Sequence, residues 1–213
     1  LLSINGQPIV DIIDYMFLIN DEYIEIEIEK QDGEIWELEV DKTFDETLGI
    51  EFENPIIDHA RSCTNNCVFC FIDQLPKGMR ESLYFKDDDS RLSFLQGNFV
   101  TLTNLKDDDI NRIIRYRISP INVSVHTTNA ELRQKMLNNK FAGNIMSRLK
   151  QLTDGGITVN AQIVLCPSYN DGEALKNTIM DLMTLRPNLN SVAIVPIGLT
   201  AHREGLLPMR GFT

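Results

Sequence analysis

The stretch RSCTNNCVFCF, residues 61–71, holds three of the four cysteines of this 213-residue chain. Cys63, Cys67 and Cys70 are spaced C-x3-C-x2-C, whereas the fourth, Cys166, lies far downstream. Three thiolates this close together on one loop can converge on a single metal ion or cluster, and thiolates favour iron–sulfur clusters and zinc. The interpretation of this loop therefore decides the expected function as well as the expected fold.

Two kinds of metal centre fit this spacing. A closed structural zinc site needs four protein ligands, so Cys166 or a histidine would have to complete it. A four-iron cluster held by only three cysteines leaves one iron open to a small molecule. Coincidental core cysteines fit less well, because Asn65 and Asn66 make the loop polar. A disulfide framework is not indicated, because such frameworks spread cysteines in even numbers over a secreted chain.

From Pro55 onward, segments rich in β-forming residues alternate with helical patterns. The expected strands are residues 55–61, 82–87, 99–104, 121–127, 157–165 and 191–199, and the clearest helical patterns are 107–117, 128–137 and 170–183. Six strands with short connections indicate a parallel βα array. We therefore expect an α/β fold, either an open sheet or a partial (βα)6 barrel, with the chemistry at the carboxyl ends of the strands.

The first 53 residues have a different residue pattern and charge. Residues 9–19 carry apolar side chains at helical spacing, and residues 24–40 alternate between apolar and acidic side chains on either side of Asp32-Gly33, which predicts a hairpin. Residues 1–53 hold 16 acidic and 2 basic side chains, whereas residues 54–213 hold 15 acidic and 18 basic ones. We therefore expect two domains, 1–53 and 54–213.

Composition narrows the remaining function classes. The net charge of −11 opposes nucleic-acid binding by the whole chain, and no nucleic-acid-binding motif is present. No apolar run approaches the ~20 residues of a membrane span, and the first residues do not form a signal peptide. We therefore expect a cytoplasmic protein that does not enter membranes. The chain begins without Met and ends at MRGFT, so we expect it to be a fragment of a longer protein.

The cysteine spacing, at this place in a βα chain, resembles the radical SAM superfamily. That resemblance implies a [4Fe-4S] cluster on Cys63, Cys67 and Cys70, with the open iron binding the amino and carboxylate groups of S-adenosylmethionine (SAM). Phe69, just before the last cysteine, also fits the superfamily pattern. Longer stretches (CTNNCVFCFIDQLPKGMRESLYF, VSVHTTNAELRQKML, QIVLCPSYNDG and VPIGLTAHREGL) are similar to a bacterial family in which a PDZ-like segment precedes the radical SAM domain and a DUF512 domain follows it.

This resemblance implies a fold and a set of cofactor contacts. The fold is a partial (βα)6 radical SAM barrel preceded by a small, N-terminally truncated PDZ-like α+β segment, with the DUF512 part beyond Thr213. SAM contacts are expected at the strand ends. They are Asp87, Asp88 and Asp89 in place of a Gly-Gly-Glu motif, Thr103 and Asn104 at the next strand end, Ser124 and His126 towards the ribose, and Pro196 beside the adenine.

Plainer interpretations of these residues stay open. The three aspartates also fit a solvated acidic turn, and His126 also fits an ordinary strand-end histidine. Cys166 is more typical of a buried apolar thiol than of a catalytic one. Arg203 is a candidate contact for a substrate or partner, and His59 is expected to be structural.

The expected function follows from the resemblance. The chain would reductively cleave SAM to methionine and a 5′-deoxyadenosyl radical, which would abstract hydrogen from an unknown substrate. An electron donor such as a ferredoxin or flavodoxin is implied, and the PDZ-like segment is a candidate site for a peptide or protein. The alternative from a different class is a non-catalytic iron–sulfur or zinc-binding protein whose PDZ-like segment recruits partners.

Overall fold

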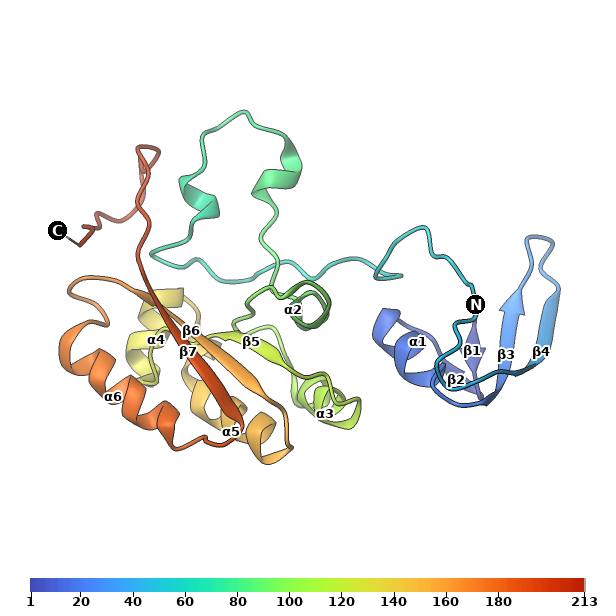
Figure 1. Ribbon diagram of the computed structural model, residues 1–213. Coiled ribbons are helices and arrows are strands. Elements are labelled where there is room, and N and C mark those ends of the chain that lie inside the picture. Colours follow the sequence, from blue (N-terminus) through green and yellow to red (C-terminus); the bar gives the residue numbers. More distant parts are fainter. Residues whose placement is uncertain (213) are drawn as a thin grey trace. The chain divides into compact units, whose positions relative to one another are not determined.

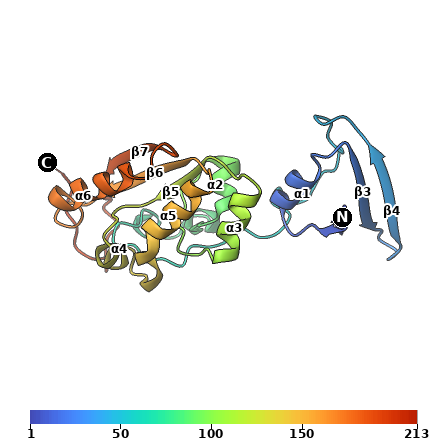
Figure 2. The same cartoon turned by 90° about the horizontal axis from the view of Figure 1, so that it is seen from below.

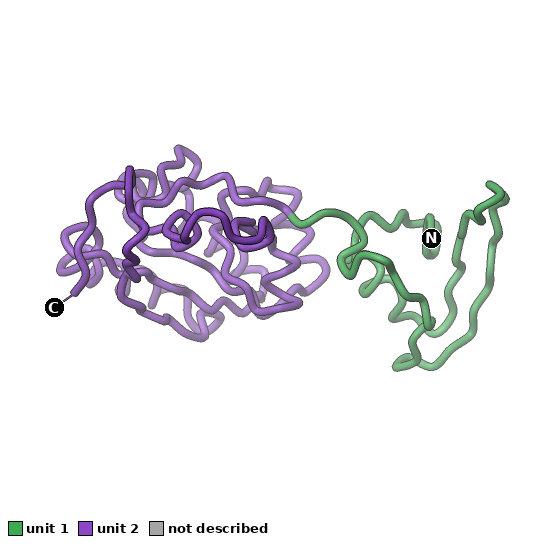
Figure 3. The backbone as a smooth tube through the Cα atoms, turned by 90° about the horizontal axis from the view of Figure 1, so that it is seen from above, with its two compact units in different colours: residues 1–60 green, residues 61–213 purple. Residues whose placement is uncertain are grey.

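The computed structural model describes residues 1–212, and the chain divides into two compact units after Ala60 (Figure 3). This division lies beyond the expected boundary at residue 53, because residues 54–60 pack with the first unit. The backbone N–H of Ile12 donates to the carbonyl of Ile56 at 3.3 Å, and Ile57 packs against the hydrophobic cluster of the first unit. Each unit is described by itself below.

The first unit combines one helix with a small antiparallel sheet. Strands β1 (Ser3–Ile4), β2 (Gln7–Pro8), β3 (Tyr23–Glu29) and β4 (Ile35–Asp41) pair in the order β2-β1-β3-β4, and helix α1 spans Ile12–Leu18 (Figure 1). The predicted helix and hairpin are confirmed, although α1 is shorter than the pattern at residues 9–19. One sheet face supplies Ile24 and Ile26 to the core, while the glutamates between them lie on the more exposed side. The PDZ likeness stays a prediction.

The second unit is built on a parallel sheet. Strands β5 (Ile121–Ser124), β6 (Val159–Leu165) and β7 (Leu189–Pro196) pair in that order. Val100 lies beside β5 through a single parallel bridge to Val123. The α-helices are α2 (Ser90–Gln96), α3 (Asp107–Arg115), α4 (Ala130–Leu137), α5 (Ile145–Asp154) and α6 (Gly172–Met183), and short 3-10 helices span Ile72–Gln74 (η1), Glu81–Tyr84 (η2) and Lys140–Asn144 (η3).

The sheet and the helices around it enclose the core of the second unit. Helix α2 packs against β5, and α5 packs against β6, as two perpendicular views show (Figures 1 and 2). Ile121, Val123, Val159 and Ile163 on the strands are fully buried, as is Leu149 on α5. Fully burying such an aliphatic side chain contributes roughly 1.5–3 kcal/mol. The strands that carry the site are therefore anchored in the core of this unit.

Of the six expected strands, two do not form and a third is reduced to a single bridge. Residues 55–61 form no strand, and only the next residue, Ser62, pairs with Asp87 in an antiparallel bridge. Residues 82–87 begin in η2 rather than in a strand. Residues 99–104 form only the bridge at Val100. The α/β class is confirmed, but the described residues form a three-stranded sheet with flanking bridges and not a six-stranded partial barrel.

Within the described residues, no helix is both long enough and apolar enough to cross a membrane.

Candidate functional site

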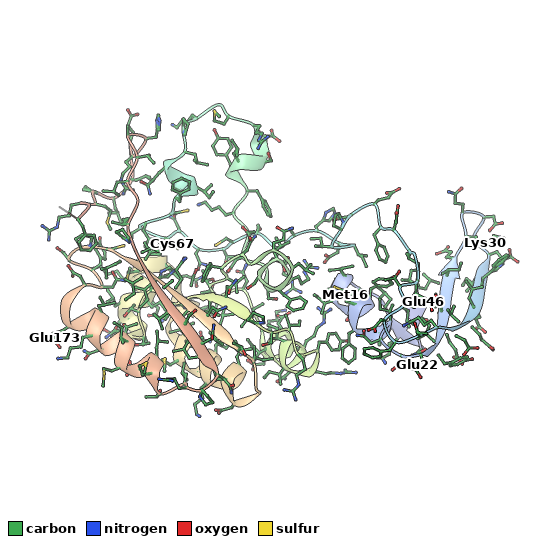
Figure 4. All side chains as sticks on the ribbon, viewed as in Figure 1. Met16, Glu22, Lys30, Glu46, Cys67 and Glu173 are labelled. Atoms are coloured by element: carbon green, nitrogen blue, oxygen red, sulfur yellow. The ribbon has the colours of Figure 1, made fainter. Side chains whose placement is uncertain are left out.

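The cysteine loop lies at the carboxyl ends of the parallel strands. Cys67 and Phe69 pack against a buried cluster that contains Cys166, which follows β6, and Ile197, which follows β7. The Phe69 ring also contacts the ring of His126, which follows β5, with 4.5 Å between ring centroids. All three strand ends therefore meet the loop, and this is the edge at which parallel α/β folds bind ligands. Figure 4 labels Cys67 at this edge.

Backbone hydrogen bonds dock the loop on the end of helix α4. The N–H of Asn66 donates to the carbonyl of Leu137 at 3.0 Å, and the N–H of Val68 donates to the carbonyl of Met136 at 2.9 Å. Both carbonyls belong to the last turn of α4, where helical carbonyls have no intrahelical partner. The loop and the helix end therefore satisfy each other, which fixes the position of Cys67 between them.

Asn65 is the hub of the loop. Its side-chain Nδ2 donates to the Sγ of Cys63 at 3.3 Å and to the Oγ1 of Thr101 at 2.9 Å. Its Oδ1 accepts from Nδ2 of Asn139 at 2.7 Å and from Oγ1 of Thr103 at 3.1 Å. Asn65 is 6% exposed. A buried amide with this many partners holds the first cysteine in a fixed place.

The three loop cysteines are free thiols that are neither fully buried nor fully exposed. Burial raises the pKa of Cys63 and raises the pKa of Cys67 to about 12, and the negative charges of neighbouring thiols act in the same direction on both. Cys63 and Cys67 are therefore protonated at neutral pH, and a bound metal would have to displace those protons. Among residues 1–212, no three His, Cys, Asp or Glu side chains are already arranged as a metal site.

The donor set nevertheless fits an iron–sulfur cluster. The charges of Cys63 and Cys70 both act on Cys67, so the three side chains lie near one another, and all three come from one loop. Lys86 lies beside Cys70: burial lowers its pKa, but hydrogen bonds to Asp73 and to Cys70 outweigh that effect and raise the pKa overall. A cation at this position offsets negative charge brought to the cysteine loop. Three thiolate donors beside a cation suit an anionic cluster.

A family model described as a radical SAM-like domain matches residues 42–192, which is more than half of the chain. The chain belongs to this radical SAM-like family. The matched range contains the whole cysteine loop, β5 and β6. No curated protein matches the chain. The family match agrees with the resemblance drawn from the sequence at the superfamily level, while the PDZ-like and DUF512 likenesses rest on the sequence alone.

In this radical SAM-like domain two residues of the acidic run, Asp88 and Asp89, are buried, and Asp87 is half-buried. Asp88 is 2% exposed and accepts hydrogen bonds from the N–H and Oγ1 of Thr101, both at 2.6 Å. Asp89 is 0% exposed, and Asp87 accepts from Nδ2 of Asn98 at 3.0 Å. The interpretation of these residues as a solvated acidic turn is therefore wrong. The expected strand at residues 82–87, which leads into this run, is replaced by η2 and a single bridge.

Asp89 has a complete set of partners. Its Oδ1 accepts from the N–H and the Nε of Arg91 at 3.0 and 2.9 Å, and its Oδ2 accepts from Nη2 of Arg91 at 2.6 Å and from the N–H of Arg61 at 2.9 Å. It is also the N-cap of α2. Burial alone would raise the pKa of Asp89, but these hydrogen bonds lower it overall. Both oxygens are used within the fold, so Asp89 has a structural role.

Thr103 and Asn104 hold the cysteine loop. The Oγ1 of Thr103 contacts Asn65, and Nδ2 of Asn104 donates to the carbonyl of Ser62 at 2.9 Å. The Oδ1 of Asn104 accepts from Oγ1 of Thr64 at 2.7 Å. These two residues therefore contact the loop on both sides of Cys63. Their use within the fold makes them positioning residues for the cysteines.

The remaining predicted contacts lie at strand ends. Ser124 ends β5 and is buried, and Pro196 ends β7 and is exposed, paired in register with Leu165. Cys166 is fully buried, and burial raises its pKa to about 12, which fits the plain interpretation as an apolar thiol. Arg203 donates to the carbonyl of Leu207 at 2.7 Å. His59 is exposed and belongs to the first unit.

His126 is a buried, neutral imidazole. Burial lowers its pKa to about 3, and the charge of Arg133 acts in the same direction. The Nδ1 atom accepts a hydrogen bond from the N–H of Val164 at 3.2 Å, so the ring proton is on Nε2. The backbone has a φ of 65°, which is unusual for a residue other than glycine. The histidine is therefore held as a neutral donor beside Phe69 of the cysteine loop.

The low pKa of His126 predicts a stability change in acid. The unfolded chain takes up a proton near pH 6.5 while the folded chain does not, so the stability contributed by neutral His126 is present above that pH and is lost as the pH falls towards 3. The loss is about 1.4 kcal/mol per pH unit, or about 2 kcal/mol from about pH 6.5 to about pH 5. Urea unfolding of the parent and of His126→Gln at both pH values measures it. Equal pH slopes in the two proteins contradict the prediction.

Sequence reasoning missed several residues that organise the site. Asn65 was noted only for the polarity of the loop, and Gln74 and Arg133 were not singled out. Gln74 is 0% exposed and ties the segment after the cysteines to the tail, through hydrogen bonds with Gly198 and Thr200. A usable signal existed for Arg133, because it lies three and four residues before the apolar Met136 and Leu137 and so shares their buried helix face.

Proposed function

We propose that this chain is a radical SAM enzyme that holds a [4Fe-4S] cluster on Cys63, Cys67 and Cys70. The observation that carries the proposal is the placement of three free cysteines of one loop at the carboxyl ends of the parallel strands. When bound, such a cluster supplies the electron for reductive cleavage of SAM to methionine and a 5′-deoxyadenosyl radical, which takes hydrogen from a substrate. The proposal specifies the reaction of SAM and names no substrate.

The chain offers a charged cavity beside the sulfurs. A cavity of about 290 Å³ is lined by Cys67, Cys70, Lys135 and Asp73, among others. Lys135 and Asp73 give it one charge of each sign, which suits the amino and carboxylate groups of an amino acid. Asp73 also forms an ion pair with Lys86 at 2.6 Å. This arrangement supports binding of the methionine end of SAM next to the cysteines, and we propose Asp73 as its acidic contact in place of Asp87, Asp88 and Asp89, which accept hydrogen bonds within the fold.

The strand ends would supply the rest of the SAM site. Neutral His126 offers its Nε2–H as a donor, since no hydrogen bond to that atom occurs in the described part of the chain. Ser124, which ends β5, and Pro196, which ends β7, flank the edge from different strands. Phe69 packs on His126 and shields it from water. We propose that these four side chains orient the nucleoside part of SAM and keep water from it.

We further propose an electron donor such as a ferredoxin or flavodoxin, because the chemistry requires one electron from outside. The sequence likeness of the first unit to a PDZ segment supports a role in binding a peptide or protein, which strand addition to an exposed sheet edge would serve. In the first unit β2 and β4 are the edge strands of the sheet. A non-catalytic iron–sulfur or zinc protein is the competing function.

Anaerobic reconstitution decides between these functions. The protein is loaded with iron and sulfide without oxygen, and then given SAM and a one-electron reductant. We expect about four iron atoms per chain and formation of 5′-deoxyadenosine and methionine in equal amounts. Protein lacking reductant and protein lacking SAM are the controls. One bound zinc per chain, or a cluster that yields no 5′-deoxyadenosine, supports the non-catalytic alternative instead.

A further inference from the structure

Arg133 on helix α4 is a buried cation. It is 1% exposed and is the largest fully buried side chain of the described residues. Its Nε donates to the carbonyl of Val125 at 2.8 Å, its Nη1 to that of Ala142 at 2.7 Å, and its Nη2 to those of Thr101 and Ser124 at 2.9 and 2.8 Å. The guanidinium therefore joins the ends of two neighbouring strand segments to the chain after α4.

All four acceptors are neutral. Each is a backbone carbonyl, and no carboxylate of residues 1–212 forms an ion pair with Arg133. Burial lowers its pKa to about 10, while the acidic groups of Cys67 and Asp88 act in the opposite direction. The side chain is therefore still charged at neutral pH. A buried charge whose hydrogen-bond acceptors are all neutral is costly, and of the two acidic groups that act on Arg133, Cys67 belongs to the cysteine loop.

Two short paths connect this charge to the cysteine loop. Along α4, the turn that follows Arg133 ends in the two carbonyls that accept the N–H groups of Asn66 and Val68, on either side of Cys67. Across the strand ends, the same Thr101 whose carbonyl accepts from Arg133 also contacts Asn65, which donates to the sulfur of Cys63. The cation thus lies directly behind the loop, on the side that is closed to water.

We propose that Arg133 is the fixed countercharge for the anionic cluster held by Cys63, Cys67 and Cys70, and that it raises the reduction potential of that cluster. The inference rests on the proposed function. Three thiolates bring three negative charges to the loop, and each electron added to the cluster increases the negative charge. A fixed cation in a region of low dielectric constant favours the more reduced state. A role limited to tying the strand ends would need the hydrogen bonds but not the charge.

The decisive measurement is the midpoint potential of the reconstituted cluster in the absence of SAM, followed by electron paramagnetic resonance. Arg133→Met removes the charge and keeps an unbranched apolar stem. We expect it to lower the equilibrium constant for reduction about tenfold, which is a shift of about 59 mV to more negative potential for a one-electron couple. Lys140→Met is the matched control, because Lys140 carries the same charge but is exposed, so solvent and salt screen it.

Arg133→Lys separates charge from hydrogen bonding. Lysine restores the cation but cannot reach all four carbonyls, so the stability of the protein falls while the potential stays near that of the parent at about pH 6. Burial lowers the pKa of a lysine, so its charge is lost as the pH rises towards about 9 and the potential falls towards that of Arg133→Met. Cys67, Asp88 and His126 are the titratable groups that interact with the side chain at 133, and they are the same in parent and variant.

The results that would overturn the countercharge differ from those that would contradict the proposed function. A parent protein that binds no cluster contradicts the proposed function, and the iron assay shows this before any potential is measured. Equal midpoint potentials in the parent and in cluster-loaded Arg133→Met overturn the countercharge. Where Arg133→Met does not retain the cluster, the Lys variant decides. Its potential must fall relative to the parent as the pH rises, and a potential that follows the parent at every pH overturns the proposal.

Discussion

Replacement of Cys63, Cys67 or Cys70 by Ala is expected to abolish iron binding, whereas replacement of Cys166 is expected to leave it intact. The three loop thiols are the only cysteines that lie together on one loop, and each would supply one thiolate to the cluster. Cys166 is fully buried, and its pKa is raised to about 12 by that burial. Iron and sulfide content after anaerobic reconstitution, with the absorbance of the loaded protein, measures the effect.

The controls show that the loss concerns the metal and not the fold. The loop cysteines are only partly buried, so the iron-free Ala variants should unfold at nearly the same urea concentration as the parent. Cys166→Ala removes a fully buried side chain from the cluster of Met136, Leu137 and Ala142, and it should cost more stability than the loop variants. Loss of iron in Cys166→Ala, or one zinc per chain in the parent, contradicts a cluster held by three cysteines.

The parts of the fold that the sequence predicted are those with a strong local pattern. The hairpin of the first unit alternates strictly between apolar and acidic residues, and it forms β3 and β4. The segments around Val123, Ile163 and Ile194 are runs of β-branched residues, and they form the parallel sheet. In each case the residues that set the pattern are the ones that the sheet needs for burial or pairing, so local and tertiary preferences agree.

The two expected strands at residues 55–61 and 82–87 do not form because their apolar residues make other contacts. Ile56 and Ile57 pack with the first unit, and the side chain of Asn54 bonds with the N–H of Ile56 and the carbonyl of Asp58 to form a turn. Tyr84 donates its hydroxyl hydrogen to the carbonyl of Pro76, and the hydroxyl oxygen accepts from the N–H of Met79, so η2 folds back on its own loop. A periodic pattern cannot show which distant surface will bury an apolar residue.

The candidate site likewise has features that the sequence predicted and features that it did not. The spacing of Cys63, Cys67 and Cys70 identified the loop directly, because metal ligands on one loop are close in sequence. The roles of Asn65 and Arg133 depend on carbonyl and hydroxyl groups of strand ends far away in the chain, such as Thr101 and Ser124. The hydrogen bonding of Asp89 is of the same kind, since its partners include the N–H of Arg61. The spacing of the proposed ligands is therefore visible in the sequence, while the residues that hold the loop are not.

Replacement of Asp89 by Ala is expected to be the most destabilising change outside the apolar core. Asp89 is fully buried with Arg91, caps helix α2, and accepts from the N–H of Arg61. Removing one partner of a buried ion pair typically costs about 3–5 kcal/mol. Urea unfolding of the iron-free protein at neutral pH measures the loss. Asp87→Ala is the matched control, because Asp87 has one hydrogen bond, from Asn98, and should cost about 1 kcal/mol.

The pH dependence of this loss has a definite sign. The pKa of Asp89 is lowered in the folded chain, so its contribution is fully present above about pH 4 and is lost as the pH falls through the ordinary aspartate range towards the folded pKa. The difference in unfolding free energy between parent and Asp89→Ala should therefore shrink in acid. A difference below about 1 kcal/mol at neutral pH contradicts the structural role of Asp89.

Asp89→Ala and Cys67→Ala should also differ in whether cooling restores iron binding. Asp89 lies behind the loop and holds Arg61, two residues before Cys63, so its loss affects the cysteines only through the fold. At a temperature low enough for Asp89→Ala to be mostly folded, iron bound per folded chain should return to the parent value. Cys67→Ala lacks a ligand at every temperature, so its iron content should stay at background. An Asp89→Ala protein that is folded yet takes up no iron would show that the carboxylate acts on the metal site itself.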